Sequence, residues 1–156
     1  MCVLKVVSGG QTGVDRAALD AARALDLPSG GWCPRGRLAE DGPIDPAYAL
    51  VETPSADYAQ RTEWNVRDSD GTLVLVPGRA TGGTALTIAL ARRLGRPLLV
   101  LDLKRDPSPD EAWRWIERGG IGVLNVAGPR ESQSPGVGAE ARAFLERLFR
   151  LSSTRA

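Results

Sequence analysis

The sequence predicts an α/β fold in which a mainly parallel sheet of about five strands lies between two layers of helices. Two observations predict it. The short apolar runs do not alternate with polar residues, which is typical of strands covered on both faces, and segments of helical periodicity separate these runs. The 156 residues, 42% hydrophobic and 25% charged, fit one globular domain. We therefore expect a single Rossmann-like three-layer sandwich over residues 1–151 and a flexible C-terminal tail at 152–156.

The first predicted strand and the first predicted helix are separated by a glycine-rich turn. Val3–Val7 is an apolar run, and the turn Ser8–Gly13 follows it directly. A helix is predicted over 14–25 because apolar residues recur there at i, i+3, i+4, i+7, i+8 and i+11. Thr12 and Asp15 have the spacing of a capping box at its start.

The remaining chain alternates between loop, strand and helix signals. Residues 28–56 are rich in glycine and proline, so we expect loop there with one short strand near 31–33. Ser108-Pro109 is a strong helix start, with an N-cap serine before a proline. The other expected elements are a helix at 57–67, a strand at 72–76, a helix from 82 to 94, a strand at 98–101, a helix from 109 to the glycines at 119–120, a strand at 121–126 and a helix over 137–151.

Composition excludes several functional classes. The net charge of +1 argues against a nucleic-acid or membrane partner. Met1–Val7 is too short for the apolar segment of a signal peptide, so we expect a cytoplasmic protein. With no histidine in the chain, no Ser–His or Cys–His nucleophile pair and no histidine-ligated metal centre can form. Cys2 and Cys33 lack the spacing of a zinc site. We therefore assign no metal ligand and no catalytic residue in this chain.

Two turns of small residues predict an anion site. Ser8–Gly13 follows one strand and Gly82-Gly83-Thr84 follows another, so both turns lie at the carboxyl edge of a parallel sheet, where open α/β sheets bind ligands. Glycines there let the backbone approach an anion, and the N–H groups of a helix start point at it. A tight turn that uses glycine only for its geometry is the plainer alternative. Neither the dinucleotide fingerprint nor the P-loop spacing is present, so the phosphate-bearing molecule is not identified.

Arginines near these turns are the candidate counter-charges. Arg61, with Thr62 beside it, precedes the strand at 72–76, although a solvated helix face would explain an arginine there equally well. Arg35 and Arg37 flank Gly36 in the long loop and either close over an acidic ligand or remain solvated. The predicted ligand-binding set is Ser8, Gly9, Gly10, Gln11, Thr12, Gly13, Arg35, Arg61, Thr62, Gly82, Gly83 and Thr84.

Five ordered motifs together resemble the putative molybdenum carrier family. They are SGGQTGVDRAALDAA from Ser8, GGWCPRGRLAEDGPI from Gly30, YAQRTEWNVRDSDGTLVL from Tyr58, GGTALT from Gly82 and NVAGPRES from Asn125. The resemblance implies a Rossmann-like homo-oligomer, a dimer or a tetramer, that binds and protects a phosphorylated molybdopterin, the molybdenum cofactor. It assigns no catalysis.

More distantly, the chain resembles the cytokinin-activating phosphoribohydrolases, the "lysine decarboxylase-like" Rossmann proteins. Their arginine–lysine pair and PGGxGTxxE motif correspond to Arg61-Thr62 and Gly82-Gly83-Thr84, but their catalytic glutamate falls near Thr87 or Ile88 here. A hydrolase would then need another carboxylate, for which the sequence offers Glu63, Asp70 or Glu131. We therefore favour a binding protein for a phosphorylated small molecule. A nucleoside-monophosphate hydrolase and a nucleotide-binding sensor are the alternatives.

Overall fold

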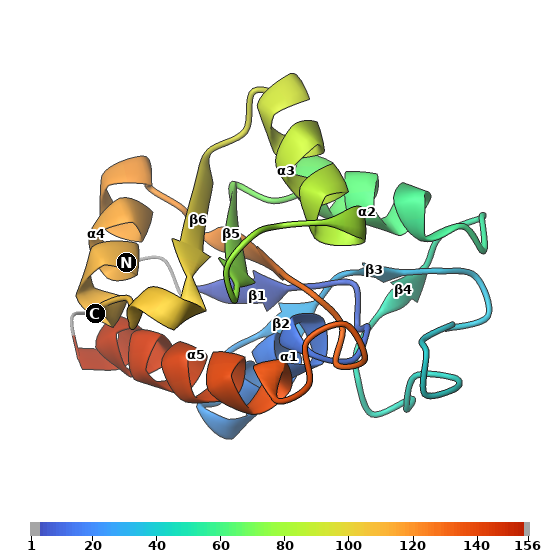
Figure 1. Cartoon of the computed structure of the whole chain (residues 1–156), viewed down its shortest axis with the longest axis horizontal. Helices are drawn as coiled ribbons and strands as arrows, with labels where there is room; N and C mark the ends of the chain where they lie inside the picture. Colours follow the sequence, from blue (N-terminus) through green and yellow to red (C-terminus); the bar gives the residue numbers. More distant parts are fainter. Residues whose placement is uncertain (1–3, 155–156) are drawn as a thin grey trace.

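A computed structural model describes residues 4–154, and within them the predicted parallel sheet is present (Figure 1). Five parallel strands lie in the order β2 (Ser29–Gly30), β1 (Lys5–Val7), β7 (Val123–Ala127), β5 (Gly71–Val76) and β6 (Leu98–Asp102). Val6 is in register with Leu124, and Leu73 with Val126. Val3, from the first predicted strand, and residues 155–156 of the predicted tail lie outside the described part of the chain.

Helices cover both faces of the sheet and give the three-layer sandwich (Figure 1). One layer holds α1 (Val14–Ala24), α4 (Pro109–Gly119) and α5 (Val137–Thr154), with α5 packed on both α1 and α4. The other layer holds α2 (Tyr58–Arg67) and α3 (Gly82–Arg93), which pack on each other. A 3-10 turn, η1 (Leu103–Arg105), follows β6. The last helix extends to Thr154, so it takes in residues 152–154, where the sequence predicts a tail.

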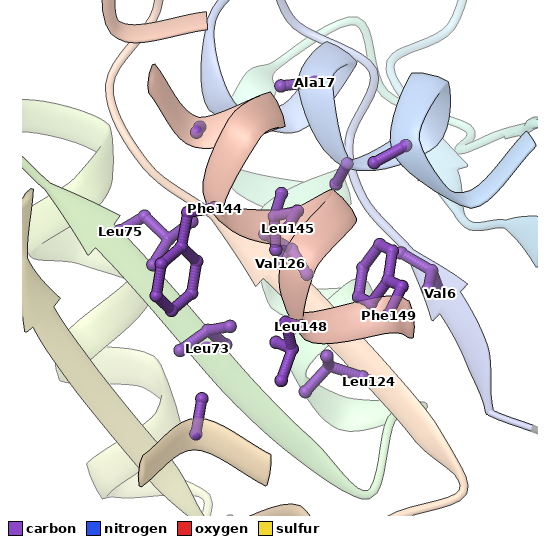
Figure 2. Packing of buried hydrophobic residues seen from close by; sticks show 14 of the residues in the cluster. Val6, Ala17, Leu73, Leu75, Leu124, Val126, Phe144, Leu145, Leu148 and Phe149 are labelled. Atoms are coloured by element: carbon purple, nitrogen blue, oxygen red, sulfur yellow. The ribbon is translucent and has the colours of Figure 1, made fainter. Parts of the chain in front are cut away.

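The main core lies between the sheet and α1, α4 and α5 (Figure 2). Leu145, Leu148 and Phe149 of α5 are almost completely buried against sheet residues such as Val6 and Leu124. Each such side chain stabilises the fold by about 1.5–3 kcal/mol through burial. Small residues on α1 let α5 approach closely; they are Ala17, Ala18, Ala21 and Ala22, all buried. This packing fixes where α1 begins, directly after the turn that follows β1.

The long segment at 28–56 is more ordered than the sequence predicts. It contributes β2 to the main sheet and forms a separate two-stranded parallel sheet from β3 (Trp32–Cys33) and β4 (Val51–Glu52). Arg37 holds the loop between β3 and β4 in place, since its guanidinium donates hydrogen bonds of 2.9–3.2 Å to four backbone carbonyls, those of Ile44, Asp45, Tyr48 and Leu50. Arg37 is therefore part of the loop's own framework.

Helix starts show where local signals hold and where they fail. Ser108 caps α4 by accepting from the Asp110 N–H at 3.2 Å, as predicted. The capping box predicted at Thr12 and Asp15 is wrong, because α1 begins after Gly13 without a side-chain cap. The Thr12 side chain instead contacts Glu40, and the Asp15 side chain contacts Arg61. Within residues 4–154, no helix has the length and apolarity needed to cross a bilayer.

Candidate ligand pocket

A pocket opens at the carboxyl edge of the sheet, between that edge and helices α2 and α3. Its empty volume, including the solvent at its open mouth, is about 740 Å³. Four segments line it: the turn after β1, one side of α2, the start of α3, and the end of β7 with the loop behind it. Its polar lining includes Gln11, Asp15, Arg61, Thr84, Thr87 and Asn125.

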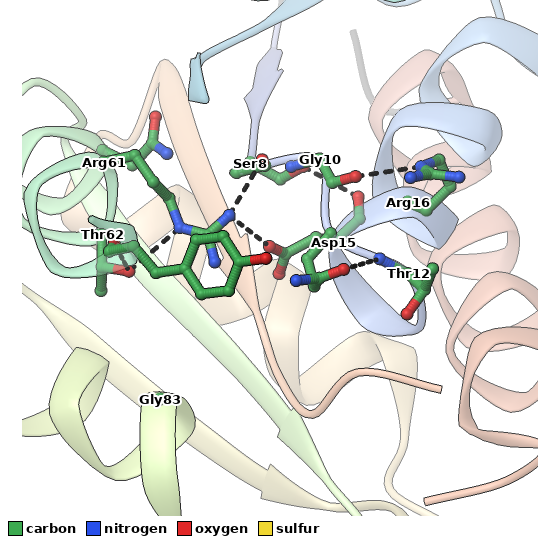
Figure 3. Close-up of polar contacts among 12 residues, drawn as sticks. Ser8, Gly10, Thr12, Asp15, Arg16, Arg61, Thr62 and Gly83 are labelled. Carbon is green, nitrogen blue, oxygen red and sulfur yellow. Dashed lines mark hydrogen bonds and ion pairs between the residues drawn. The ribbon is translucent and has the colours of Figure 1, made fainter. Parts of the chain in front are cut away.

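Arg61 of α2 is the buried cation of this pocket (Figure 3). Its Nη1 donates to the Gly9 carbonyl at 3.0 Å, and its Nε donates to the Thr62 hydroxyl at 3.2 Å. The guanidinium also lies 5.1 Å from the centroid of the Tyr58 ring. A buried arginine that lines a polar pocket is well suited to a phosphate or carboxylate, because its planar fork donates several hydrogen bonds at once.

Asp15 is a pocket residue that the sequence reasoning missed. Its Oδ2 lies 3.7 Å from Arg61 Nη1, and both side chains are only 10% exposed. Burial raises the pKa of Asp15 from 3.8 to about 6, against the opposing effects of the Arg61 charge, the Gln11 N–H hydrogen bond and the Arg16 charge. Its position just inside a predicted helix suggested a capping role, and no local pattern pointed to the pocket instead.

The start of α3 leaves one backbone N–H group of the pocket lining unpaired among residues 4–154. Thr84 N–H and Ala85 N–H both bond to the Thr81 carbonyl, and Thr81 gives the helix no side-chain cap. Within the part of the chain that the structure describes, the Gly83 N–H has no hydrogen-bond partner. A Cβ placed on Gly83 would meet no atom within 4 Å. An open helix start with an unpaired amide is the arrangement that favours an anion.

Several backbone N–H groups of the turn Ser8–Gly13 form hydrogen bonds within the protein. Gly10 N–H bonds to the Ser8 hydroxyl at 3.3 Å, Thr12 N–H to the Gln11 side-chain oxygen at 3.0 Å, and Ser8 N–H to the Gly30 carbonyl at 3.2 Å. At the first residue of α1, Val14 N–H bonds to the Pro129 carbonyl. Gly9 and Gln11 line the pocket, whereas the other residues of the turn do not.

Glycine at two positions of this turn is needed for close packing. A Cβ on Gly9 would lie 2.3 Å from Arg61 Nη1. A Cβ on Gly13 would lie 2.4 Å from the Pro129 carbonyl oxygen, at a φ of +80°. These glycines bring the turn up to α2 and to the loop behind β7.

Thr12 faces the loop between β3 and β4 (residues 34–50). Its hydroxyl donates to the Glu40 carboxylate, which also accepts from the Ser132 hydroxyl at 2.5 Å and the Ser132 N–H at 3.2 Å. The Ser132 and Thr12 hydrogen bonds lower the pKa of Glu40 below its ordinary value. The loop between β3 and β4 is thus fastened to the loop that follows β7.

The predicted set therefore divides. The pocket brings together Gly9, Gln11, Arg61, Thr62, Gly83 and Thr84; its lining does not include Ser8, Gly10, Thr12, Gly13, Arg35 and Gly82. Arg35 is exposed, and its backbone N–H bonds to the Ser55 carbonyl. Asp15, Thr87 and Asn125 line the pocket although the sequence prediction did not include them.

The carboxylates proposed for a hydrolase serve other purposes. Glu63 pairs with Arg93 at 3.2 Å. Asp70 accepts from two backbone amides at the start of β7, and Glu131 accepts from the Gly136 and Gly138 N–H groups near the start of α5. At the position of the missing glutamate, Thr87 lines the pocket and its hydroxyl donates to the Gly83 carbonyl at 3.0 Å. Asp15 is the acidic residue in the pocket lining.

No cluster of three or more cysteine and carboxylate side chains that could hold a metal ion is found among residues 4–154. Trp32 and Trp64 contact each other edge-to-face at 4.8 Å, and neither lines the pocket.

The sheet order, the helical layers and this polar pocket define a Rossmann-like α/β protein with a pocket at the carboxyl edge of its sheet. The sequence model of the circularly permutated YpsA SLOG family matches residues 6–149, and the chain belongs to that family. It is also similar to a crystal structure of a protein from Syntrophus aciditrophicus named "putative molybdenum carrier protein". The two share 44% identity over 95% of this chain and 96% of the other, with a TM-score of 0.88. Curated proteins give no match.

Proposed function

We propose that this protein binds a phosphorylated small molecule in the pocket and holds it without turnover, as a carrier of the molybdenum cofactor. One observation carries the proposal: the buried guanidinium of Arg61 and the unpaired Gly83 N–H at the start of α3 line the same pocket. A charged fork and a helix start together favour a phosphate. The name of the structural neighbour supports the choice of cargo.

The residues present fit such a cargo. Arg61, Gly83 and Thr84 would hold the phosphate, and Tyr58, Ala59 and Leu86 offer a less polar wall for a ring. Oxygens on a bound molybdenum would meet hydrogen-bond donors such as the side chains of Gln11 and Asn125, which also line the pocket. The cargo would bring its own sulfur ligands, so the pocket has to supply hydrogen bonds and charge only.

The substitution Gly83→Leu tests the proposal. Gly83 belongs to the pocket lining, and a side chain there would start from a position with no neighbour within 4 Å, so it would add bulk at the pocket without displacing packed atoms. We expect the wild-type protein, purified under native conditions, to release a phosphorylated pterin that mass spectrometry identifies, and Gly83→Leu to release at least ten-fold less.

Ala85→Leu is the matched control, because Ala85 is exposed on the same turn of α3 and does not line the pocket. It should retain the ligand. Gly83→Leu should melt at or above the wild-type temperature because leucine favours helix over glycine, and Ala85→Leu should melt close to it because alanine and leucine are both good helix formers. Equal ligand content in Gly83→Leu and Ala85→Leu would place the ligand elsewhere.

A second candidate function is hydrolysis of nucleoside monophosphates, and the observation that favours it is Asp15. A carboxyl group whose pKa is raised to about 6 has the value expected of a general acid. Free base released from nucleoside monophosphates by the wild-type protein, and lost in Asp15→Asn, would replace the holding role with this enzymatic one.

A further inference from the structure

The pocket proposed for an anion contains a carboxylate of its own. Asp15 and Arg61 lie 3.7 Å apart and are both buried (Figure 3), so the pair is close to neutral when Asp15 is ionised. A phosphate that binds Arg61 would add a second negative group beside Asp15. Two anions sharing one buried cation are strongly disfavoured unless one of them takes a proton.

The surroundings of Asp15 leave Arg61 as its main source of positive charge. On its own helix, Arg16 is committed elsewhere, since it donates to the Gly10 carbonyl at 3.0 Å and pairs with Asp41 at 3.0 Å. From the loop behind β7, Arg130 lines the pocket, and its Nε lies 3.9 Å from Glu40. From α2, Tyr58 lines the pocket beside Arg61.

We propose that Asp15 couples ligand capture to the uptake of one proton. The phosphate of the ligand takes over Arg61, the Asp15 carboxylate accepts a proton from solvent, and no covalent bond forms or breaks. The inference rests on the proposed function and deepens it: the pocket takes up the anionic group of the ligand together with one proton, and it releases that group as the pH rises. Burial already brings the pKa of Asp15 to about 6, so near neutral pH the proton is taken up at little cost.

Inorganic sulfate is a suitable probe because it stays a dianion between pH 5.5 and 8, whereas phosphate itself titrates there. We expect the dissociation constant for sulfate, measured by calorimetry, to rise by up to about ten-fold per pH unit above the pKa of Asp15, as a one-proton linkage requires. Titrations in two buffers of different ionisation enthalpy should count about one proton taken up per sulfate.

Asp15→Asn keeps the shape of the neutral acid and removes the titration. We expect this variant to bind sulfate with the same affinity at every pH and more tightly than the wild-type protein at pH 8. Asp20→Asn is the control: it removes a carboxylate from the same helix, where Asp20 accepts from the Tyr48 hydroxyl, and should keep the wild-type pH dependence.

The outcomes separate the two proposals. Sulfate binding to the wild-type protein that is independent of pH and takes up no proton overturns the inference and leaves the anion pocket standing. Failure of sulfate to bind the wild-type protein and Asp15→Asn at every pH overturns the anion pocket itself. If Asp15→Asn does not fold, the proton count of the wild-type protein decides alone.

Discussion

At the residue scale, the pairing of Asp15 with Arg61 distinguishes this pocket from a phosphate-binding site that has only cationic side chains. The arginine contacts the backbone of the turn after β1 through the Gly9 carbonyl and contacts α2 through Thr62. It therefore joins two elements of the fold while its charge remains available to the pocket. When it is ionised, Asp15 offsets that charge, but burial makes its ionisation less favourable overall, because burial outweighs the attraction of Arg61 and raises the pKa of Asp15.

Asp15 should also make stability depend on pH. Its folded pKa of about 6 lies above its ordinary value of 3.8, so the folded state binds this proton more tightly than the unfolded state does. The resulting stabilisation is complete below about pH 4 and is lost as the pH rises through 6. By linkage the loss is on the order of 3 kcal/mol.

We expect Asp15→Asn to raise the free energy of unfolding by about 1–3 kcal/mol at pH 8 and to change it little at pH 4, as urea denaturation at the two pH values would show. An equal change at both pH values would mean that packing, and not ionisation, is responsible.

At the element scale, the covering loop between β3 and β4 is held by contacts between distant parts of the chain. Glu40 binds Thr12 on one side and Ser132 on the other, and the Gln11 side-chain oxygen accepts from the Glu40 N–H at 2.9 Å. The turn after β1, the covering loop and the loop after β7 are therefore connected through one glutamate.

Glu40→Ala removes the acceptor of all three hydrogen bonds from Thr12 and Ser132. We expect amide hydrogen exchange to become several-fold faster across 34–48 and 130–134, with α4 unchanged. Asp41→Ala is a matched control, because it changes the residue next to Glu40 and removes only the ion pair with Arg16. The faster exchange that it causes should stay close to Asp41 and Arg16. Unchanged exchange across 130–134 in Glu40→Ala would contradict the connection.

Elements with strong local signals are predictable from the sequence. The cap and proline at Ser108-Pro109 and the apolar run at 72–76 each form the expected element. The two-residue strands β2, β3 and β4 are too short to show periodicity, and their pairing depends on the rest of the sheet. The region at 28–56 therefore could not be resolved beyond a loop with one strand.

The pocket is predictable only in part, for a similar reason. Glycine turns after strands point to the carboxyl edge of the sheet, and Gly83 and Arg61 do lie there together. The Thr12 hydroxyl, however, donates to Glu40 in the loop between β3 and β4, and Gly13 lies close to Pro129, which is more than a hundred residues away in the chain. Spacing alone cannot show such a partner, so Thr12 and Gly13 looked like ligand contacts.

At the scale of the whole molecule, the side of the chain that carries α3 has exposed apolar residues beside an open edge of the sheet. Leu94, directly after α3, and Val100 of the neighbouring edge strand β6 are 37% and 39% exposed. Among the strands described, β6 pairs with β5 alone and leaves one edge open, and an open apolar edge is usually covered in a native protein. If the homo-oligomer that the family resemblance implies forms, we expect a second copy of the chain to lie on this edge.

Val100→Glu should therefore weaken self-association. The new charge would lie on the open edge strand, where a copy that covers it would have to desolvate the carboxylate. Light scattering coupled to size exclusion should give a dimer or larger for the wild-type protein and a larger monomer fraction for the variant. Val51→Glu is the control, because Val51 is 59% exposed on β4, outside the main sheet, and should leave the mass unchanged. A wild-type protein that is monomeric at high concentration would contradict the proposed contact and leave the pocket complete within one chain.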